Sequence, residues 1–428
     1  MSGRPAASGW LQLMACGTTQ GLLSVADALA TYRRVLAPLS AQELPIEAAL
    51  GQVLAETVRA AVDLPLFDQS AVDGYAVRSE DLQRASPQRP VRLTLSGEIP
   101  AGQSTARAVA LGCAMRILTG APVPAGADTI VRQEWVVGEG GVVRVERALA
   151  PATDLRLRGE ELRRGAVLAD PGLRLDAGRL AALAMAGVSR VKVHPRARIT
   201  VLVTGDEVKP VGELLAPGQI FDANGPLVRG WLAQRGQPLV RCCVVADRFD
   251  NVCEALAQAL EESDAVITTG GVSVGDRDHV PDAAERLGLT RHFWKLAQKP
   301  GKPLWFGTRT QAGRSIPLIG LPGNPAAVLV GLVVHVAAVI RALEGEDAEP
   351  EWGYAALQED AMPADQRDQW LRMQLRTDPL SGTATLAPLP RQASHMLSNM
   401  MAADVLAWVP ASEEAWRAGS VVRWLALR

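Results

Sequence analysis

A glycine-rich loop that follows a short apolar run, within residues 264–278, has the composition of an anion-binding site. Residues 265–269 are apolar or β-branched, which is typical of a strand buried on both faces. The loop then carries small or hydroxyl-bearing residues: Gly270, Gly271, Ser273 and Gly275. Such a loop between a strand and a helix offers free N–H groups to a phosphate. An ordinary turn has the same composition, so the loop alone leaves both interpretations open.

Lysine side chains are concentrated in residues 295–303, at Lys295, Lys299 and Lys302. Ammonium groups suit phosphate or another oxyanion, and the prolines between them stiffen the backbone. A group of lysines is also typical of a solvated edge. The aromatic residues on both sides of this segment favour a binding site.

Carboxylates accompany these loops at Asp206, Asp222, Asp276 and Asp278. Their oxygens can orient hydroxyl groups or hold Mg²⁺. Each aspartate taken alone is more typical of a turn or a helix cap than of a ligand site.

The elements that must position these residues alternate between strand and helix from residue 196 to residue 343. This pattern predicts a three-layer α/β domain with a mainly parallel sheet, in which ligands bind beyond the carboxyl ends of the strands. The loops that leave such ends are residues 204–207, 270–278, 295–303 and 320–325. We therefore expect them to converge on one crevice, which adds these candidates: Thr204, Gly205, Pro322, Gly323 and Asn324.

The rest of the chain predicts a multidomain α/β plus β protein. Short strands separated by turns predict a small β unit near residues 91–145, and the pattern is again β from residue 351. Helices are expected at residues 22–36, 45–60 and 177–186. The predicted parts are a disordered leader (1–20), a helical or mixed linker region (21–62 and 155–194), an inserted β domain (63–154), the α/β domain (195–345) and a C-terminal β domain (346–428).

Composition excludes several classes of protein. The chain has 428 residues, 48% of them apolar and 21% charged, as in ordinary soluble globular proteins. A net charge of -2 gives no overall attraction to nucleic acid or to an anionic membrane. The five cysteines form no Cys-x-x-Cys pair, which disfavours a disulfide framework and a zinc site. No apolar run reaches transmembrane length, and the short apolar stretch before Cys16 is a poor export signal, so we expect a leader or a start at Met14.

Several common catalytic motifs are not found in the sequence. The loop at residues 270–275 is not Gly-x-Gly-x-x-Gly, and no P-loop sequence occurs. A His-Glu-x-x-His motif is also lacking, although residues 271–275 (Gly-Val-Ser-Val-Gly) do have Gly-x-Ser-x-Gly spacing. Hydride transfer, P-loop hydrolysis of nucleotides and zinc-dependent hydrolysis are therefore disfavoured.

A series of short blocks, in order along the chain, resembles the molybdopterin molybdenumtransferase family of the bacterial MoeA type, which is related to the E domain of gephyrin. The blocks are residues 68–76 (Asp-Gln-Ser-Ala-Val-Asp-Gly-Tyr-Ala), 119–122 (Thr-Gly-Ala-Pro), 158–160 (Arg-Gly-Glu), 204–207 (Thr-Gly-Asp-Glu), 218–222 (Gly-Gln-Ile-Phe-Asp), 269–275, 295–303, 320–325 and 394–397 (Ser-His-Met-Leu). Together they span the chain from about Leu22 to its C-terminus.

The resemblance implies a molybdopterin-binding α/β domain, an inserted β domain and a C-terminal β-barrel. It also implies a homodimer whose active cleft lies between the subunits. The implied reaction takes adenylylated molybdopterin, molybdate and Mg²⁺, releases AMP and leaves molybdenum on the dithiolene sulfurs. The implied setting is the cytoplasm, where a molybdopterin adenylyltransferase and molybdoenzyme maturation proteins are the expected partners.

The resemblance also implies roles for individual residues. Catalytic positions carried over by motif are Asp73, Thr119, Glu161, Asp222, Asp278, Lys295 and Lys299. Arg372 and Ser394 are implied in substrate binding from the barrel, and Asp276 and Asp278 are our candidates for holding Mg²⁺. The chain departs from the family pattern at three positions, where Glu161 replaces the usual Asp, Val72 the usual Met and Ala393 the usual Gly.

Two other functions remain open from the sequence. The adenylyltransferase of the preceding step shares the α/β domain and its glycine-rich loop, but it resembles that domain alone. A non-catalytic scaffold could keep the whole fold, although the lysines and aspartates of the crevice argue against a purely structural role. The choice between molybdate and tungstate cannot be read from the sequence.

Overall fold

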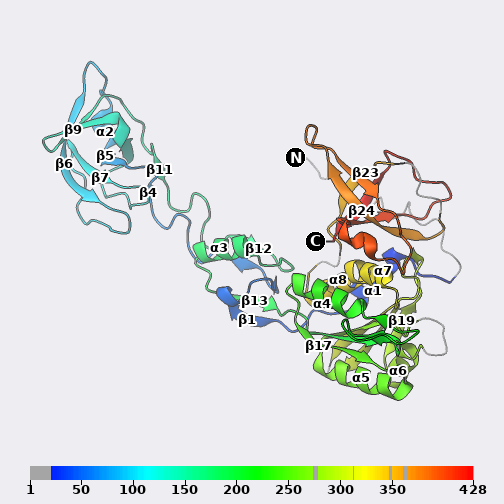
Figure 1. Ribbon diagram of the computed structural model, residues 1–428. Coiled ribbons are helices and arrows are strands. Elements are labelled where there is room, and N and C mark those ends of the chain that lie inside the picture. The colour runs from blue at the N-terminus through cyan, green and yellow to red at the C-terminus, as the bar shows by residue number, and fades with distance from the viewer. Residues whose placement is uncertain (1–20, 273–277, 312, 347–348, 360–364, 428) are drawn as a thin grey trace.

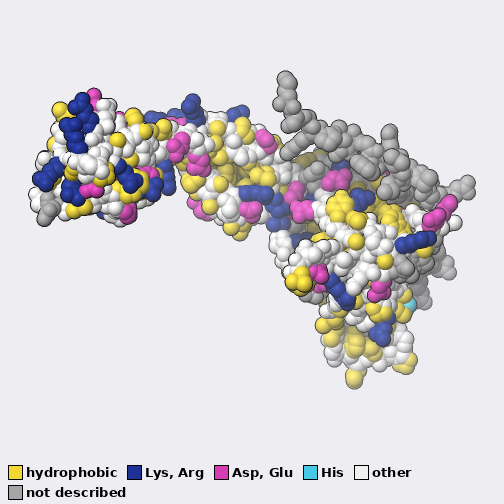
Figure 2. All heavy atoms as spheres, turned by 90° about the horizontal axis from the view of Figure 1, so that it is seen from above, with side chains coloured by type: hydrophobic (Ala, Val, Ile, Leu, Met, Phe, Trp, Pro, Cys, Tyr) yellow, Lys and Arg dark blue, Asp and Glu magenta, His cyan; other side chains and the backbone are white. Residues whose placement is uncertain are grey.

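The computed structural model describes residues 21–272, 278–311, 313–346, 349–359 and 365–427. The predicted leader, residues 1–20, lies outside the described residues. Figure 1 shows an inserted β domain at one end, a narrow linker region, and an α/β domain with a β-barrel at the other end. Seen from above in Figure 2, the β domain and the linker form an arm that extends from the larger body.

The α/β domain is built on a six-stranded sheet of order β17-β14-β18-β22-β21-β19. The strands are β14 (Ile199–Thr204), β17 (Leu239–Val245), β18 (Ala265–Thr269), β19 (Thr290–Trp294), β21 (Trp305–Gln311) and β22 (Arg314–Leu321). Strands β17, β14, β18 and β22 are parallel, and β21 and β19 are antiparallel to their neighbours. The mainly parallel sheet is thus confirmed, with a β-hairpin added at one edge.

Helices cover both faces of this sheet, which makes the three predicted layers (Figure 1). They are α1 (Val25–Val35), α4 (Asn224–Gln234), α5 (Phe249–Glu262), α6 (Val280–Arg286), α7 (Pro325–Val330) and α8 (Ala337–Leu343). Alternate residues of one strand point to opposite faces, so Val201 and Val203 pack against α1, α4 and the last helices. Leu202, between them, packs against α5 and α6.

The last helical stretch, Pro325–Leu343, runs through a π-helical segment, η4 (Gly331–Val336), between α7 and α8. Its 19 residues are long and apolar enough to cross a membrane by length and composition, so the sequence-based statement that no such run exists is wrong. Inside this fold 83% of that window is buried. The stretch is therefore apolar all round because it is a core helix.

The C-terminal region is a closed five-stranded barrel. Its strands are β23 (Gly353–Leu357), β24 (Asp368–Thr377), β25 (Ala384–Pro388), β26 (Val405–Val409) and β27 (Val421–Ala426). Closure follows because β24 pairs with both β25 and β26. A short strand from the α/β domain, β20 (Gln298–Lys299), pairs in parallel with the start of β24. The crevice loops and the barrel are thereby joined by backbone hydrogen bonds.

The inserted β domain holds a second six-stranded sheet, of order β8-β5-β7-β6-β10-β9. Its strands are β5 (Gly74–Val77), β6 (Val91–Ile99), β7 (Cys113–Ile117), β8 (Thr129–Arg132), β9 (Val136–Glu139) and β10 (Val142–Val145). The two faces of the sheet carry separate apolar clusters around Val77 and Ala76, which are neighbours on β5. This matches the short-strand pattern expected for residues 91–145.

The helix expected at residues 45–60 is wrong. That segment forms β1 (Gln42–Pro45), a 3₁₀ turn η2 (Ile46–Ala48), β2 (Val53–Leu54) and β3 (Val58–Arg59). Gly51 has a φ of 75° and donates its N–H to the carbonyl of Leu175 at 2.7 Å, which ends any helix there. Strand β13 (Arg190–His194) pairs with β1 and β2, so long-range pairing overrides the local helical pattern. The helix α3 (Ala177–Met185) forms as expected.

Asp264 holds the amino end of strand β18 against its neighbours. Its carboxylate is only 6% exposed and accepts hydrogen bonds from the Arg198 backbone N–H at 2.9 Å and from the Arg198 and Arg314 guanidinium groups. Burial alone would raise the pKa of Asp264, but these hydrogen bonds outweigh it and hold the pKa below its usual value. The ionised carboxylate therefore stabilises the folded state.

We expect Asp264→Asn to lower the free energy of unfolding by about 1–3 kcal/mol at pH 7, because charge-assisted hydrogen bonds are lost. The lowered pKa means that this stabilisation is present above the unfolded-state pKa of about 3.9 and is lost as the pH falls below it. Denaturant unfolding followed by tryptophan fluorescence at pH 7 and pH 3 measures both effects. Glu261→Gln, at an exposed position of α5, is the control and should change the free energy by less than about 0.5 kcal/mol. An equal cost of Asp264→Asn at both pH values would contradict this account.

Candidate functional site

The carboxyl ends of β14, β18 and β22 meet at Gly270. Its N–H donates to the carbonyl of Leu321 at 2.9 Å. A Cβ on Gly270 would lie 2.7 Å from Thr204 Oγ1 and 2.8 Å from the Thr204 carbonyl, and the residue has a φ of 90°. Only glycine fits this close approach, so the predicted residues Thr204 and Gly270 are packed together at the head of the crevice.

Gly271 completes the turn from β18 toward α6. Its φ is 66°, and its carbonyl accepts the N–H of Val280, the first residue of α6, at 3.2 Å. The remaining predicted residues of this loop, Ser273, Gly275 and Asp276, lie outside the described residues. Gly205, on the neighbouring loop, is buried with a φ of 142°.

The loop of residues 320–325 connects three parts of the fold. Asn224, at the start of α4, donates its side-chain amide to the carbonyl of Gly323 at 2.8 Å. Asn324 donates to Ser394 Oγ at 3.1 Å, and the Ser394 carbonyl accepts the N–H of Ala326 at 3.1 Å. The predicted residues Gly323, Asn324 and Ser394 are thus brought together, although Ser394 belongs to the C-terminal region.

Two other predicted residues border this cluster in different ways. Pro322 is buried between β22 and α7, where it shapes the turn. Asp222 accepts the N–H of Gly225 at 2.8 Å and so caps the start of α4.

The lysine loop, residues 295–303, is fixed where it begins. Lys295 has a φ of 75°, which is uncommon for a residue with a side chain, and its ammonium lies 4.3 Å from the centre of the Trp294 ring. The Trp294 indole N–H in turn donates to the carbonyl of Val272 at 2.9 Å. This contact links the lysine loop to the glycine-rich loop, as the sequence predicted.

Lys299 and Lys302 are both exposed. Lys299 Nζ lies 3.0 Å from Asp365 Oδ2. Burial raises the pKa of Asp365, but the hydrogen bond from Lys299 and the backbone N–H of Arg367 outweigh it and lower the pKa. Lys299 is therefore held beside the barrel by a carboxylate that an incoming anion would have to replace.

Arg372 is a buried cation of the barrel. The residue is 2% exposed, and its Nη2 donates to the carbonyl of Arg391 at 2.9 Å. Its Nε has no hydrogen-bond partner, and burial lowers its pKa. Among the described residues no carboxylate forms an ion pair with it. An unpaired buried guanidinium on the strand that pairs with β20 is well suited to an anion.

The aspartates of the crevice form a loose acidic group. The Asp247 N–H donates to Asp206 Oδ1 at 3.1 Å. Burial, and after it the charges of Asp206 and Glu207, raise the pKa of Asp247. Asp278 is half-buried beside α6. Within the described ranges there is no group of three or more His, Cys, Asp or Glu residues arranged to hold a metal ion.

Asp73 and Thr119 lie together in the inserted β domain. Asp73 Oδ1 accepts the Thr119 backbone N–H at 2.8 Å and the Thr119 hydroxyl at 2.7 Å. These bonds lower the pKa of Asp73. Glu161 is exposed in the linker region, where its N–H donates to the carbonyl of Leu64 at 3.0 Å. Within one chain these residues do not reach the crevice, because the linker separates the two domains (Figure 1).

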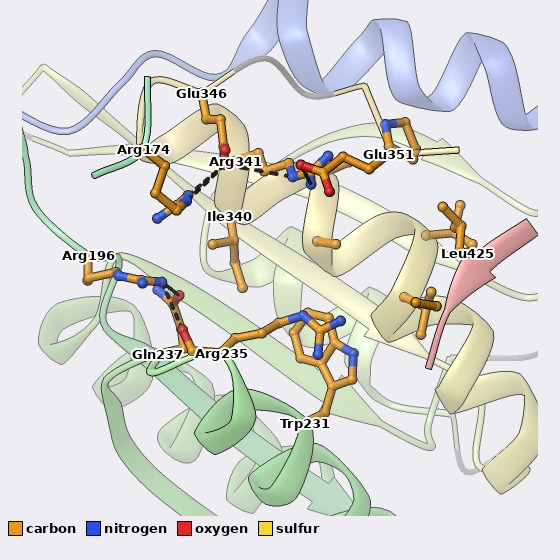
Figure 3. A pocket seen from close by; sticks show the side chains of 16 residues that line it. Arg174, Arg196, Trp231, Arg235, Gln237, Ile340, Arg341, Glu346, Glu351 and Leu425 are labelled. Atoms are coloured by element: carbon orange, nitrogen blue, oxygen red, sulfur yellow. Dashed lines mark hydrogen bonds and ion pairs between the residues drawn. The ribbon is translucent and has the colours of Figure 1, made fainter. Parts of the chain in front are cut away.

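A pocket of about 330 Å³ opens elsewhere, between the linker, the last helices and β27 (Figure 3). It lies beside Arg196, before the amino end of β14, and so at the opposite end of the sheet from the crevice. Arg174 is paired with acids, at 2.8 Å from Glu344 and 2.7 Å from Glu346, whereas Arg235 lies over the Trp231 ring. We interpret this pocket as a structural contact, in which ion pairs hold the linker region to the α/β domain.

Sequence reasoning missed three residues of the crevice: Trp294 as an indole donor, Asp365 and Asp247. The aromatic flank of the lysine loop pointed toward Trp294 without showing its contact. Asp365 lies 66 residues from Lys299. Pairing across that separation leaves no local signal, and the same holds for Asp247 and Asp206, which come from different loops.

Family comparisons cover most of the chain. The description "MoeA N-terminal region (domain I and II)" matches residues 23–187, "Probable molybdopterin binding domain" matches residues 200–342 and "MoeA C-terminal region (domain IV)" matches residues 354–427. The three matches follow the order of the inserted β domain with its linker, the α/β domain and the barrel.

Individual relatives agree with these matches. A molybdopterin molybdenumtransferase of Staphylococcus epidermidis is 30% identical over 401 residues, which are 94% of this chain and 94% of that protein. The enzyme of that name from Nostoc sp. is 38% identical over 298 residues, 70% of this chain and 68% of that protein. The crystal structure of a molybdopterin biosynthesis moeA protein from Pyrococcus horikoshii OT3 matches with a TM-score of 0.78 and 26% identity, covering 94% of this chain and 99% of that one.

Matches of this identity extend over nearly the whole chain, through all of its structural parts. The chain therefore belongs to the molybdopterin molybdenumtransferase family of the MoeA type.

Proposed function

We propose that this transferase of molybdenum cofactor biosynthesis inserts molybdenum from molybdate into adenylylated molybdopterin and releases AMP. The proposal rests on a glycine-only turn, on a lysine loop linked to it through Trp294 and to the barrel through β20, and on a buried barrel arginine that has no acid partner among the described residues. The glycine turn suits a phosphate ester. The lysine loop and the buried arginine suit a dianion such as molybdate.

The pterin phosphate would bind at the glycine turn. Gly270 and Gly271 have positive φ values, and a Cβ on either residue would meet Thr204, so only glycine forms this tight turn. The N-terminus of α7 faces the same crevice, since Asn324 precedes its first turn. The dipole of the helix that begins here favours negative charge at this place.

Molybdate would bind between the lysine loop and the barrel. Lys299 can exchange its contact with Asp365 for the oxyanion, and Arg372 has a donor without a partner. Ser394 Oγ, held by Asn324, adds a hydroxyl from the same region. Several donors aimed at one dianion orient it for attack by the dithiolene sulfurs.

Magnesium fits the donors of this crevice only in part. Mg²⁺ takes one or two carboxylates and completes its shell with substrate phosphates and water. Asp278 is the described candidate ligand, and Asp276 would be the second. Burial, and after it the charges of Asp206 and Glu207, raise the pKa of Asp247, and a nearby cation would favour its ionised form. The ion would neutralise charge on the phosphoanhydride that is cleaved.

A homodimer would bring the remaining residues to the crevice. Asp73 and Thr119 hold each other in a defined geometry on the inserted β domain, far along the arm from their own lysine loop. A partner subunit arranged by two-fold symmetry can place its arm at the crevice of the first, and reciprocally. Glu161, exposed on the linker, would follow the same arm.

The setting that we propose is the cytoplasm, upstream of molybdoenzyme maturation proteins and downstream of a molybdopterin adenylyltransferase. Cys113, Cys242, Cys243 and Cys253 are free thiols in this structure, as suits a reducing compartment. An adenylyltransferase function is less well supported, because the inserted β domain and the barrel lie outside the domain which the two enzymes share. A purely structural scaffold would not need an unpaired buried Arg372.

Lys299→Ala should lower kcat/KM for molybdate by about 10²-fold, because a preorganised cation at the oxyanion is lost. AMP release and molybdenum incorporation measure this effect. Lys192→Ala, a change of an exposed lysine in the linker region, is the matched control and should leave kcat/KM unchanged. Equal kcat/KM values in the two variants would show that Lys299 does not bind the oxyanion.

Asp278→Asn should shift the Mg²⁺ concentration for half-maximal AMP release upward by about tenfold, because Mg²⁺ prefers an anionic oxygen. A titration with Mg²⁺ at saturating substrate measures the shift. Asp282→Asn, in the first turn of α6, serves as the control and should leave the titration unchanged. An unaltered Mg²⁺ dependence in Asp278→Asn would remove this residue from the metal site.

Subunit mixing tests the shared cleft. Asp73→Asn and Lys299→Ala homodimers should both be nearly inactive, whereas a heterodimer of the two contains one intact cleft and should recover about half of the wild-type activity. Differently tagged chains, co-expressed and purified over both tags, allow the AMP release rate of the heterodimer to be measured. Absence of recovery in a purified heterodimer would mean that the cleft is not shared between subunits.

A further inference from the structure

A buried chain of polar side chains runs from α1 to the lysine loop. The Tyr32 hydroxyl lies 3.0 Å from His335 Nδ1, and His335 Nε2 lies 3.0 Å from Gln298 Oε1. Gln298 Nε2 then donates to the carbonyl of Gly301 at 3.1 Å. Tyr32, His335 and Gln298 are each 0% exposed. The chain ends inside the loop that carries Lys295, Lys299 and Lys302.

The direction of every hydrogen bond in this chain follows from chemistry. The Gly301 carbonyl can only accept, so the Gln298 amide must turn its NH₂ toward it and its oxygen toward His335. His335 Nε2 must then carry the proton, and Nδ1 must accept from the Tyr32 hydroxyl. Burial lowers the pKa of His335 to about 3, so a neutral ring with this single tautomer is the state at physiological pH.

Close packing restricts the conformations that these hydrogen-bonded side chains can adopt. Tyr32 meets Phe306 edge-on at 4.7 Å between ring centres and lies 5.8 Å from Phe293. His335 sits in the π-helical segment of the last helix, a type of distortion frequently found at functional sites. A Cβ on Gly301 would lie 2.8 Å from Gln298 Nε2, so glycine is needed where the amide reaches the loop.

Gln298 and Lys299 are adjacent residues of β20, which pairs with β24. Their side chains point to opposite sides of the strand, so an anchor on Gln298 sets the direction of Lys299. The backbone N–H of Ala297 donates to the carbonyl of Leu23 at 2.8 Å, which ties the same loop to the segment that leads into α1. Two links from the α1 region thus converge on the residues just before Lys299.

We propose that His335, through Gln298, is a positioning residue that holds Lys299 in the geometry needed to bind the oxyanion. The role rests on the proposed function of Lys299, but the hold on the loop can be measured without it. His335 touches neither substrate nor the reacting atoms in this account; it acts through the Gln298 amide. Because the hydrogen bonds from Tyr32 to Gly301 form one directed series, loss of the ring should loosen the loop rather than unfold the domain.

The test compares four variants of the full-length protein. His335→Leu removes both ring nitrogens, and His335→Gln returns an amide N–H that can reach Gln298 Oε1. Gln298→Met removes the amide and leaves His335 in place, which keeps the test available if His335→Leu does not fold. Val339→Ala controls for loss of packing, because Val339 is buried in the same helical stretch but takes no part in the hydrogen-bonded series.

Two measurements are made on each variant: amide hydrogen exchange of residues 295–304, and kcat and KM for molybdate in AMP release. We expect His335→Leu and Gln298→Met to speed exchange in this loop at least tenfold. They should also lower kcat/KM for molybdate by about 10²-fold, because displacement of a positioning group by about 1 Å has this effect. The KM for adenylylated molybdopterin should stay within about threefold, since the glycine turn is untouched.

His335→Gln should restore the exchange rate of the loop and kcat/KM for molybdate to within about threefold of wild type. Val339→Ala should change neither quantity.

Three results would overturn the proposal. One is an equal loss of activity in Val339→Ala and His335→Leu; another is a folded His335→Gln that is no better than His335→Leu. The third is faster exchange in the loop with unchanged kcat/KM. A wild-type protein that releases no AMP would instead contradict the proposed function, and the exchange measurement would still decide whether His335 holds the loop.

Discussion

The parallel pairing of β20 with β24 is the contact on which the crevice depends most. It joins Gln298 and Lys299 of the α/β domain to Asp368 and Gln369 of the barrel. Because the pairing is made by backbone hydrogen bonds, it sets a register between the two domains that side chains alone would not hold. Lys299 meets Asp365 as a result, and Arg372 lies a few residues further along the same strand. Without this register the cations of the crevice would belong to two separate surfaces.

The charged side chains at the two ends of the α/β sheet differ in how they are paired. At the amino end, Arg174 and Arg341 are paired with Glu344, Glu346 and Glu351, and the pairs of Arg174 join the linker region to the α/β domain. At the carboxyl end, Arg372 lacks an acid partner among the described residues, and Lys299 has a single exchangeable one. A buried cation without an acid partner raises the free energy of the folded protein, and a bound anion lowers that free energy again. The contrast supports the proposal that the ion-paired pocket at the amino end is structural and that the cations at the carboxyl end bind substrate.

Much of the α/β domain could be predicted from sequence because its signals are local. Apolar β-branched runs such as residues 265–269 and helix-start residues such as Asn324 determine strands and turns by themselves. The glycine turn was predicted from the types of Gly270 and Gly271, and the structure adds the reason, which is contact with Thr204. The segment at residues 45–60 was predicted wrongly, because its partner β13 lies far along the chain and long-range pairing decides its structure. The pairs Lys299–Asp365 and His335–Gln298 were beyond sequence reasoning for the same reason.

The most direct test of the central claim is a single-turnover reaction of the purified wild-type chain with adenylylated molybdopterin, molybdate and Mg²⁺. AMP and molybdenum cofactor should appear together and in equal amounts, and omission of molybdate should suppress both products. AMP release that is independent of molybdate, or AMP release without molybdenum bound to the pterin, would contradict the account of a crevice that couples an oxyanion site to a phosphate site.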